Sequence, residues 1–136
     1  MDVTQDRAIN ALAISLNFRQ MRQNLSAANI ANSETPNYHA RRLDFEEALK
    51  RALDNEGEQT MRVENKRHYN VGEGGVSELQ PEIYEDQNGV ISEDGNSVVQ
   101  DTEMALMAQN KILYDASVQL LNKKLGLMKY AIGAER

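Results

Sequence analysis

The residue types that most often carry out catalysis or bind metals are scarce in this sequence. Its 136 residues include two histidines and no cysteine, so a thiolate nucleophile, a thiolate metal site and a disulfide are all excluded. His39 and His68 have no second ligand at metal-binding spacing, and no HExxH, GxSxG, GxxxxGK[ST] or GxGxxG motif occurs. We therefore predict no catalytic residue, no metal site and no cofactor, and expect that the protein is not an enzyme.

One short segment shares some residues with a calcium-binding loop. It reads Asp86-Gln87-Asn88-Gly89, and oxygen atoms of such side chains are the ligands that calcium prefers. An EF-hand loop needs glycine at its sixth position and glutamate at its twelfth. Here the glycine is fourth and the twelfth residue is not glutamate, so we predict no calcium site.

Acidic residues are concentrated in the second half of the chain. Residues 68–110 contain nine carboxylates and no lysine or arginine, in a chain whose net charge is −6. A solvated surface and an electrostatic contact with a basic partner both fit this segment. Arg41-Arg42 is likewise either a solvated pair or a partner contact. Nucleic-acid binders have a concentrated basic face, so we expect no nucleic-acid partner, and no motif indicates a small-molecule substrate.

The first residues do not resemble a cleaved secretion signal. Residues 1–10 contain two aspartates and an arginine, and no uncharged apolar run of signal length follows them. No segment has the roughly 18 consecutive apolar residues that a membrane span needs. If the protein leaves the cytoplasm, we expect it to do so without a cleaved signal peptide.

The spacing of apolar residues predicts a long helix over residues 101–133. A seam of residues with 3-4 spacing runs along it, and a second stripe repeats every seven residues beside the seam. This face is wider than one partner needs, so the helix should contact more than one neighbour. Asp101 is the predicted N-cap, with Ser97 and Gln100 as an alternative capping box. The seam comprises Met104, Met107, Lys111, Tyr114, Val118, Leu121, Leu125, Met128 and Ile132, and the stripe comprises Leu106, Leu113, Leu120 and Leu127.

A second helix is predicted near the N-terminus, within residues 4–33. Ala11, Ile14, Phe18, Met21, Leu25 and Ala28 follow the same 3-4 rhythm. Two long helices of similar length favour an antiparallel, coiled-coil-like pair. The predicted assembly seam of the pair comprises Ile14, Phe18, Met21, Leu25, Tyr114, Val118, Leu121, Leu125, Met128 and Ile132.

The middle of the chain, residues 34–100, has a different character. A D-x-x-E cap at Asp44 and Glu47 precedes an apolar stretch and predicts a short helix. Asn88-Gly89 is typical of a type I′ hairpin turn, and Asp94-Gly95 of another turn. The hairpin strands would include Ile83-Tyr84 and Val90-Ile91. We thus expect one domain, residues 1–136, that is mainly α with an irregular or β-hairpin middle segment.

A run of short polar residues follows the first predicted helix. Asn29, Asn32 and Thr35 lie where an apolar helix ends, and such residues readily bond the backbone groups that a helix end leaves free. They either cap the helix and turn the chain or, in addition, contact neighbouring subunits. Both interpretations remain open from the sequence.

Residues 27–38, AANIANSETPNY, closely resemble the ANxxNxxTPGY signature of the flagellar axial proteins that build the rod, hook and filament. Residues 43–49, 94–98 and 120–125, reading LDFEEAL, DGNSV and LLNKKL, look like the short proximal-rod members of that family. The resemblance covers both ends of the chain and is weak across the middle. The axial motif it indicates comprises Ala28, Asn29, Asn32, Thr35, Pro36, Asn37 and Tyr38.

The resemblance implies a structural subunit of the proximal rod in the bacterial flagellar basal body. Such a subunit is exported by the flagellar type III apparatus and assembles through its terminal helices in the periplasmic rod, where it transmits torque. Its partners would be other proximal-rod proteins, the rod-to-ring adaptor, the export apparatus and copies of itself. A freestanding helical-bundle interaction module, such as a secretion chaperone or adaptor, is the alternative.

The sequence departs from the signature at one position, because the glycine that usually follows the proline is Asn37 here. With Pro36 second in a β-turn, the family's glycine at the third position indicates a type II turn, which needs a positive φ there. Asparagine tolerates positive φ better than other non-glycine residues. We therefore predict that Asn37 keeps the turn with a positive φ.

Overall fold

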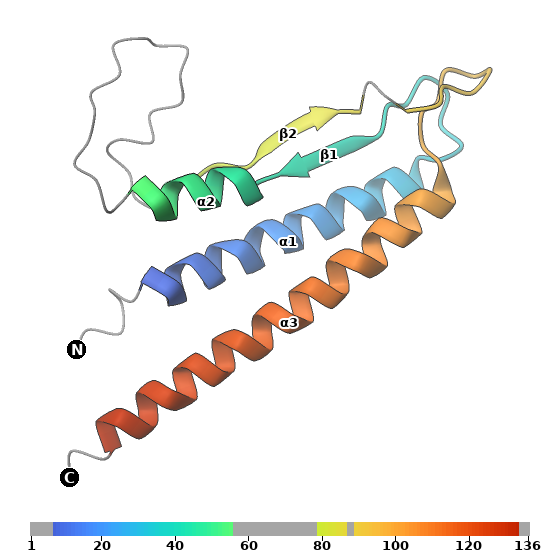
Figure 1. The fold of residues 1–136 in the computed structure, drawn as a ribbon. Helices are drawn as coiled ribbons and strands as arrows, with labels where there is room; N and C mark the ends of the chain where they lie inside the picture. Colours follow the sequence, from blue (N-terminus) through green and yellow to red (C-terminus); the bar gives the residue numbers. More distant parts are fainter. Residues whose placement is uncertain (1–6, 56–78, 87–88, 134–136) are drawn as a thin grey trace, which may run out of the picture.

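The computed structural model describes residues 7–55, 79–86 and 89–133. Helix α1 (Arg7–Ala31) lies between helix α3 (Gln100–Gly133) on one side and a layer of three short elements on the other (Figure 1). That layer consists of strand β1 (Arg41–Asp44), helix α2 (Glu46–Asn55) and strand β2 (Glu82–Glu85). The fold is mainly helical, as predicted, and no described helix is long and apolar enough to cross a membrane.

The two long helices run antiparallel, which confirms the prediction. Asn29 near the end of α1 contacts Glu103 near the start of α3, and Gln23, earlier in α1, contacts Asn110, later in α3. Helix α1 has 25 residues and α3 has 34, so α3 continues past the first residues of α1 (Figure 1). The C-terminal part of α3 therefore has no described segment covering it.

The side of α3 that faces α1 is more polar than the apolar seam predicted. The most buried residues of α3 are Glu103 and Asn110, each one position before a predicted seam residue, Met104 or Lys111. The predicted seam residues Leu125 and Ile132 are exposed in the free chain. Hydrogen bonds to α1 account for the difference, because they fix α3 in a rotation that points polar groups inward. The seam positions Met107, Tyr114, Val118, Leu121 and Met128 are half-buried.

The apolar core lies on the opposite side of α1, against β1 and α2. Phe18 of α1 packs with Leu43 of β1 and with Phe45, and the two aromatic rings are 5.3 Å apart between centroids. All three side chains are at most 4% exposed, so each contributes on the order of 2 kcal/mol through burial. The half-buried residues around this cluster are Ile14, Met21, Leu25, Leu49 and Leu79.

The middle segment contains a small antiparallel pair of strands, as expected, but its pairing differs from the predicted hairpin. Strand β2 pairs with β1, with Leu43 opposite Ile83, and Val90-Ile91 form no strand. Asn88 lies outside the described residues. The physical reason is that β1 is held against α1 by Leu43 and offers β2 a fixed edge, whereas Val90 and Ile91 are largely exposed.

Two predicted helix caps also differ in detail. Helix α3 begins at Gln100, so Asp101 lies within its first turn and is not the N-cap. The hydroxyl of Ser97 accepts a hydrogen bond from the backbone N–H of Ala40 at 2.9 Å, so it is used between segments and not to cap α3. The short helix predicted after Asp44 is confirmed as α2, which begins one residue after Phe45.

Candidate functional site

A polar cluster with four buried members, Asn29, Asn96, Ser97 and Glu103, joins the end of α1 to the start of α3. We call it the polar junction and define it as Asn29, Asn32, Thr35, Tyr38, Arg42, Asn96, Ser97 and Glu103. Its members come from α1, from the turn that follows α1, from β1, from the segment that leads into α3, and from α3 itself. The sequence separates these segments by as many as 74 residues.

Asn29 is the centre of the polar junction and is 0% exposed. Its amide nitrogen donates to the carbonyl of Arg41 at 2.9 Å and to a carboxylate oxygen of Glu103 at 3.0 Å. Its amide oxygen accepts from the backbone N–H of Arg41 at 3.0 Å and from the hydroxyl of Tyr38 at 3.2 Å. All four hydrogen-bonding positions of the amide are thus used. This one side chain therefore connects α1, residues 38–41 and α3.

Glu103 is a fully buried carboxylate and is paired with a cation. The Arg42 guanidinium donates to one of its oxygens, and Asn29 donates to the other. Arg42 also donates to Asp86 at 3.2 Å, which links β1 to the segment after β2. A buried charge is tolerated only when it is paired and hydrogen-bonded, so this contact fixes how α3 sits on β1.

The turn after α1 is held by a second buried amide. Asn96 is 2% exposed, and its amide nitrogen donates to the carbonyl of Asn32 at 2.9 Å and to that of Thr35 at 2.7 Å. Its amide oxygen accepts from the N–H of Val98 at 2.7 Å. Within the turn, the Thr35 hydroxyl donates to the side-chain oxygen of Asn32 at 3.1 Å. Of the residues predicted to bond backbone groups at the end of the helix, Asn32 does so, because its amide nitrogen donates to the carbonyl of Ala28 at 2.8 Å.

Asn37 has a φ of 58°, as predicted for the position where the family signature has glycine. The N–H of Tyr38 donates to the carbonyl of Thr35 at 3.3 Å and closes the turn, while the N–H of Asn37 donates to the carbonyl of Asp94 at 3.0 Å. Gly95, with a φ of 79°, lies directly beside this turn. A Cβ atom on Gly95 would be 2.4 Å from the side-chain oxygen of Asn37. The turns at residues 37 and 95 therefore pack this closely because residue 95 is glycine.

Asn37→Val is expected to lower the free energy of unfolding by on the order of 1–3 kcal/mol, because a β-branched residue is strained at positive φ. Asn37→Gly should be at least as stable as the parent, since glycine adopts this conformation without strain. Urea unfolding of the three purified proteins measures the difference. A valine variant as stable as the glycine variant would contradict the argument.

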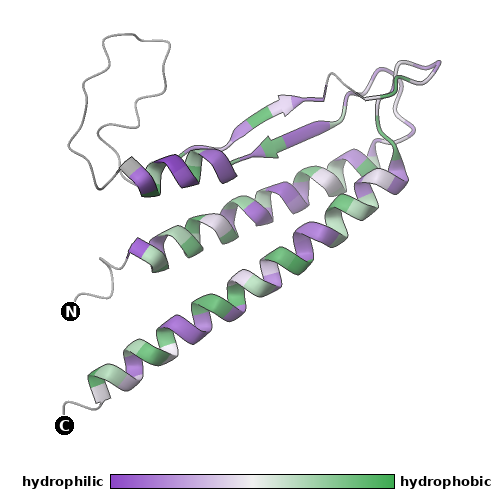
Figure 2. Ribbon diagram, viewed as in Figure 1, coloured by the Kyte–Doolittle hydropathy of each residue, from purple (hydrophilic) through white to green (hydrophobic). Residues whose placement is uncertain are grey.

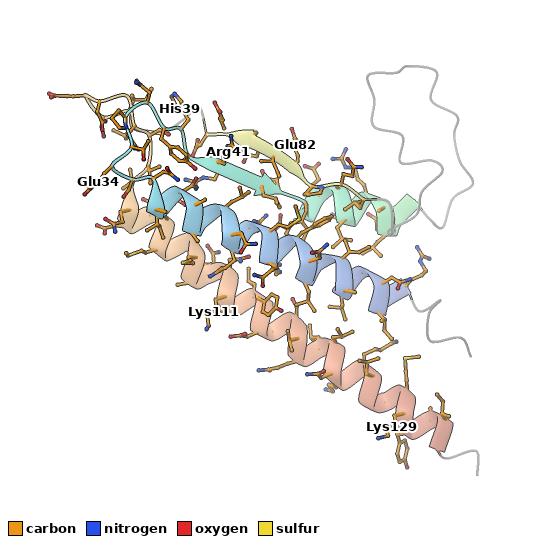
Figure 3. All side chains as sticks on the ribbon, turned by 180° about the vertical axis from the view of Figure 1, so that it is seen from behind. Glu34, His39, Arg41, Glu82, Lys111 and Lys129 are labelled. Atoms are coloured by element: carbon orange, nitrogen blue, oxygen red, sulfur yellow. The ribbon has the colours of Figure 1, made fainter. Side chains whose placement is uncertain are left out.

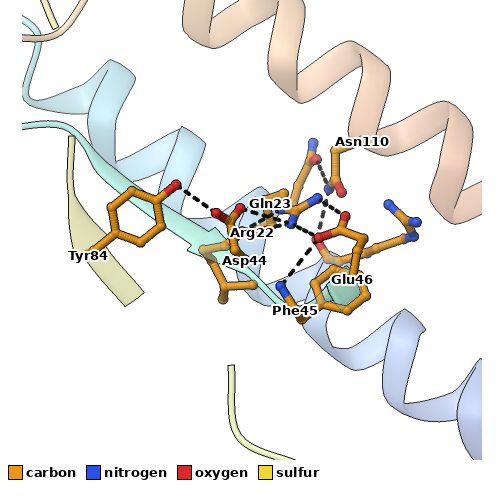
Figure 4. A network of polar contacts seen from close by, with 9 residues as sticks. Arg22, Gln23, Asp44, Phe45, Glu46, Tyr84 and Asn110 are labelled. Carbon is orange, nitrogen blue, oxygen red and sulfur yellow. Dashed lines mark hydrogen bonds and ion pairs between the residues drawn. The ribbon is translucent and has the colours of Figure 1, made fainter. Parts of the chain in front are cut away.

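A separate ion pair attaches α1 to the start of α2 (Figure 4). The Arg22 guanidinium donates to the two carboxylate oxygens of Glu46 at 2.6 and 2.8 Å, and to the carbonyl of Leu43 at 2.7 Å. Arg22 also lies over the ring of Phe45, 4.9 Å from its centroid. Partial burial raises the pKa of Glu46, but hydrogen bonds from Arg22 and from backbone N–H groups outweigh it and lower the pKa to about 2.

Glu46 should make stability depend on pH in the acid range. Because its folded-state pKa is lowered from 4.5 to about 2, its contribution is present above pH 4.5 and is lost as the pH falls towards 2. Glu46→Gln should remove this contribution, which we expect to be at most about 1 kcal/mol because the side chain is half-exposed. Urea unfolding at pH 7 and pH 3 tests it, with Glu47→Gln as the neighbouring control. Equal acid sensitivity in both variants would contradict it.

The predicted site residues fall into two groups. The axial-motif residues from Asn29 to Tyr38 come together in and around the polar junction, and His39 and Glu34 lie exposed at the same end (Figure 3). The predicted assembly seam does not form one surface. Ile14, Phe18, Met21 and Leu25 belong to the core against β1 and α2, whereas Tyr114, Val118, Leu121, Leu125, Met128 and Ile132 follow α3.

Sequence reasoning did not predict the role of five residues in these contacts, namely Arg42, Asn96, Ser97, Glu103 and Asn110. The Asn110 amide donates to the carbonyl of Arg19 at 2.8 Å and to Gln23 at 3.0 Å. For Glu103 and Asn110, the sequence did contain a signal of this role. A polar residue within an apolar heptad pattern marks a position that needs a specific partner.

The polar junction has the properties of a structural joint. Its side chains bond one another and the backbone of neighbouring segments. Within residues 7–55, 79–86 and 89–133, no group of three or more His, Asp or Glu side chains could hold a metal ion. The arrangement fixes the angle between the two long helices and the strand layer.

Exposed apolar residues recur along α3, whose ribbon includes many hydrophobic segments (Figure 2). The predicted stripe of Leu106, Leu113, Leu120 and Leu127 is exposed along its whole length. Ile112, Tyr130 and Ile132 are also exposed. An apolar surface of this extent is rare on a soluble monomer and marks an interaction site.

Comparison with known proteins identifies relatives along most of the chain, although no family model matches it. The flagellar basal body rod protein FlgB of Cereibacter sphaeroides is 37% identical over 123 residues, which cover 90% of this chain and 91% of that protein. The protein of the same name from Salmonella typhimurium is 33% identical over 134 residues, covering 94% and 95% of the two chains. That from Escherichia coli is 33% identical over 130 residues, covering 90% and 91%.

Proposed function

Because the chain belongs to the FlgB family of flagellar basal-body rod proteins, and is therefore a structural protein of the basal-body rod, we propose that it builds the proximal rod through its terminal helices. The observation that carries this proposal is the exposed apolar stripe of α3, which has no described partner within the chain. Burial of that stripe against neighbouring subunits would stabilise the rod by about 25 cal/mol per Å² of apolar surface removed from water.

The polar junction supports a mechanical role for the subunit. Torque transmission requires that the terminal helices keep a fixed relation to the rest of the chain under load. Buried, fully bonded polar groups define one arrangement more strictly than apolar packing does. Asn29, Glu103 and Arg42 join α1, α3 and β1 in this way, so a force on α3 would be passed to β1 without a change of angle.

The proposed partners are other proximal-rod proteins, the rod-to-ring adaptor, the export apparatus and copies of the chain itself. We further propose export through the flagellar type III apparatus into the periplasmic rod without a cleaved signal peptide. The axial motif supports this export route by its resemblance to the family of exported axial proteins. The proposed role is structural and involves no catalysis, cofactor, nucleic acid or small-molecule substrate.

A deletion strain tests the proposed function. Removing the gene should abolish basal-body rods and swimming, and expressing the chain in the same strain should restore both and place the protein in purified basal bodies. Export is tested by fusing residues 1–35 to a passenger and measuring its flagellum-dependent secretion. A deletion strain that still swims would favour the alternative, a freestanding interaction module such as a secretion chaperone or adaptor.

A further inference from the structure

A groove of about 270 Å³ opens between α1, β1 and α3. Its apolar lining includes Leu25 of α1 and two residues one heptad apart on α3, Leu106 and Leu113. Both α3 leucines are exposed in the free chain. The polar lining includes Arg41 of β1 and Asn110 of α3. The groove is also lined by Arg22 and Arg42, which are paired with carboxylates, and by Asp44 and Glu46.

Two polar groups of the groove lack partners within the part of the chain that the structure describes. Asn110 is only 5% exposed, and its side-chain oxygen accepts no hydrogen bond there. A buried acceptor without a donor costs about 1–3 kcal/mol. The guanidinium of Arg41, on the neighbouring strand, likewise forms no hydrogen bond or ion pair with another described residue. A complementary ligand would therefore bring a hydrogen-bond donor and a carboxylate on an apolar segment.

The loop of residues 89–95 on the same molecule has these groups. Val90 is 76% exposed and Ile91 is 61% exposed. Ser92 offers a hydroxyl, and the exposed carboxylate of Glu93 has no partner among the described residues. The N–H of Ser92 donates to the carbonyl of Asn96 at 2.8 Å, and this bond holds the loop at the end of the molecule (Figure 1).

We propose that the groove binds the 89–95 loop of a second copy of the chain, with Val90 and Ile91 packed against Leu106 and Leu113. In this contact Glu93 pairs with Arg41, and the hydroxyl of Ser92 donates to the oxygen of Asn110. The inference rests on the proposed function and specifies one contact within it. The groove and the loop are different surfaces. A copy that uses its groove therefore still has a free loop, and a copy that uses its loop still has a free groove. Repetition of such a contact generates a helical array.

Disulfide cross-linking tests the contact directly, since the chain has no cysteine. Two forms of the chain, Ile91→Cys and Leu106→Cys, carry different tags and are co-expressed in the deletion strain. Oxidation of basal bodies from swimming cells should give a product that contains one copy of each. Ile91→Cys with Lys50→Cys, an exposed position on α2, is the matched control and should give little product. A yield no higher than the control, or cross-linking of Leu106→Cys only to another protein, would overturn the proposal.

Charge exchange provides the second arm of the test. Arg41→Glu and Glu93→Arg, each introduced alone into the cysteine pair, should reduce the cross-linked fraction by about tenfold, because like charges then face each other. Both changes together should restore it, and Lys50→Glu should have no effect. Failure of the double change to restore cross-linking would also overturn the proposal. If the unmodified chain does not restore rods to the deletion strain, the proposed function itself fails, which is a separate result.

Discussion

Arg42→Met is expected to lower the free energy of unfolding by about 3–5 kcal/mol, because it leaves the buried carboxylate of Glu103 without its cation. Glu103 is 0% exposed, and Arg42 and Asn29 are its two partners in the structure. Small domains are stable by only about 5–15 kcal/mol, so this loss is a large part of the total. Urea unfolding of the purified chain, followed by circular dichroism, measures it.

The adjacent arginine provides a matched control for this prediction. Arg41→Met removes a guanidinium that has no described partner, so its effect on the free energy of unfolding should be within about 0.5 kcal/mol. Adding Glu103→Gln to Arg42→Met should recover most of the stability, because the neutral amide can still accept a hydrogen bond from Asn29. Equal losses for Arg41→Met and Arg42→Met would show that the ion pair does not hold the polar junction together.

Leu127→Asp is expected to abolish rod assembly while leaving the free chain folded. Leu127 is 60% exposed, so an aspartate there remains solvated in the monomer and should change its stability by no more than about 0.5 kcal/mol. In the proposed rod the same carboxylate would lie unpaired at an apolar interface, which costs several kcal/mol per subunit. Because every subunit carries the change, the penalty repeats along the array.

The assembly prediction is checked by comparing swimming and isolated basal bodies in the complemented deletion strain. Gln119→Asp introduces the same charge at an exposed polar position on the same helix and should swim normally. Unfolding curves of both variants confirm that the monomers remain intact. Normal swimming with Leu127→Asp would mean that this part of α3 faces solvent in the assembly.

The sequence was sufficient to predict the long helices, their antiparallel relation, the short helix and the conformation of Asn37. These features depend on local rules, namely the 3-4 spacing of apolar residues, helix caps and the few residue types that tolerate positive φ. The family signature is sufficient to indicate the axial motif. The signature therefore indicates Asn29 and Asn32 but not their partners, Glu103 and Asn96.

The sequence was not sufficient to predict that Glu103 and Asn110 are the most buried residues of α3, although five predicted seam residues are half-buried. Met104 and Glu103 are adjacent, and the apolar pattern favours burial of Met104. Glu103 is the buried residue because Asn29 and Arg42, which lie in other segments, bond its carboxylate. The strand partner of β2 was missed for a similar reason. Its position depends on the packing of Leu43 against Phe18, a tertiary contact that no local turn signal reports.

The polar junction also determines the order in which the chain can fold. Asn29 and Glu103 are 74 residues apart, and closing a loop of that length costs about 1.6 kcal/mol more than closing one of 12 residues. Contacts within α1, β1 and α2 span much shorter loops and should form first. The polar junction therefore forms only after Glu103 has been synthesised. Until then, a nascent chain contains α1 without α3, its long partner helix.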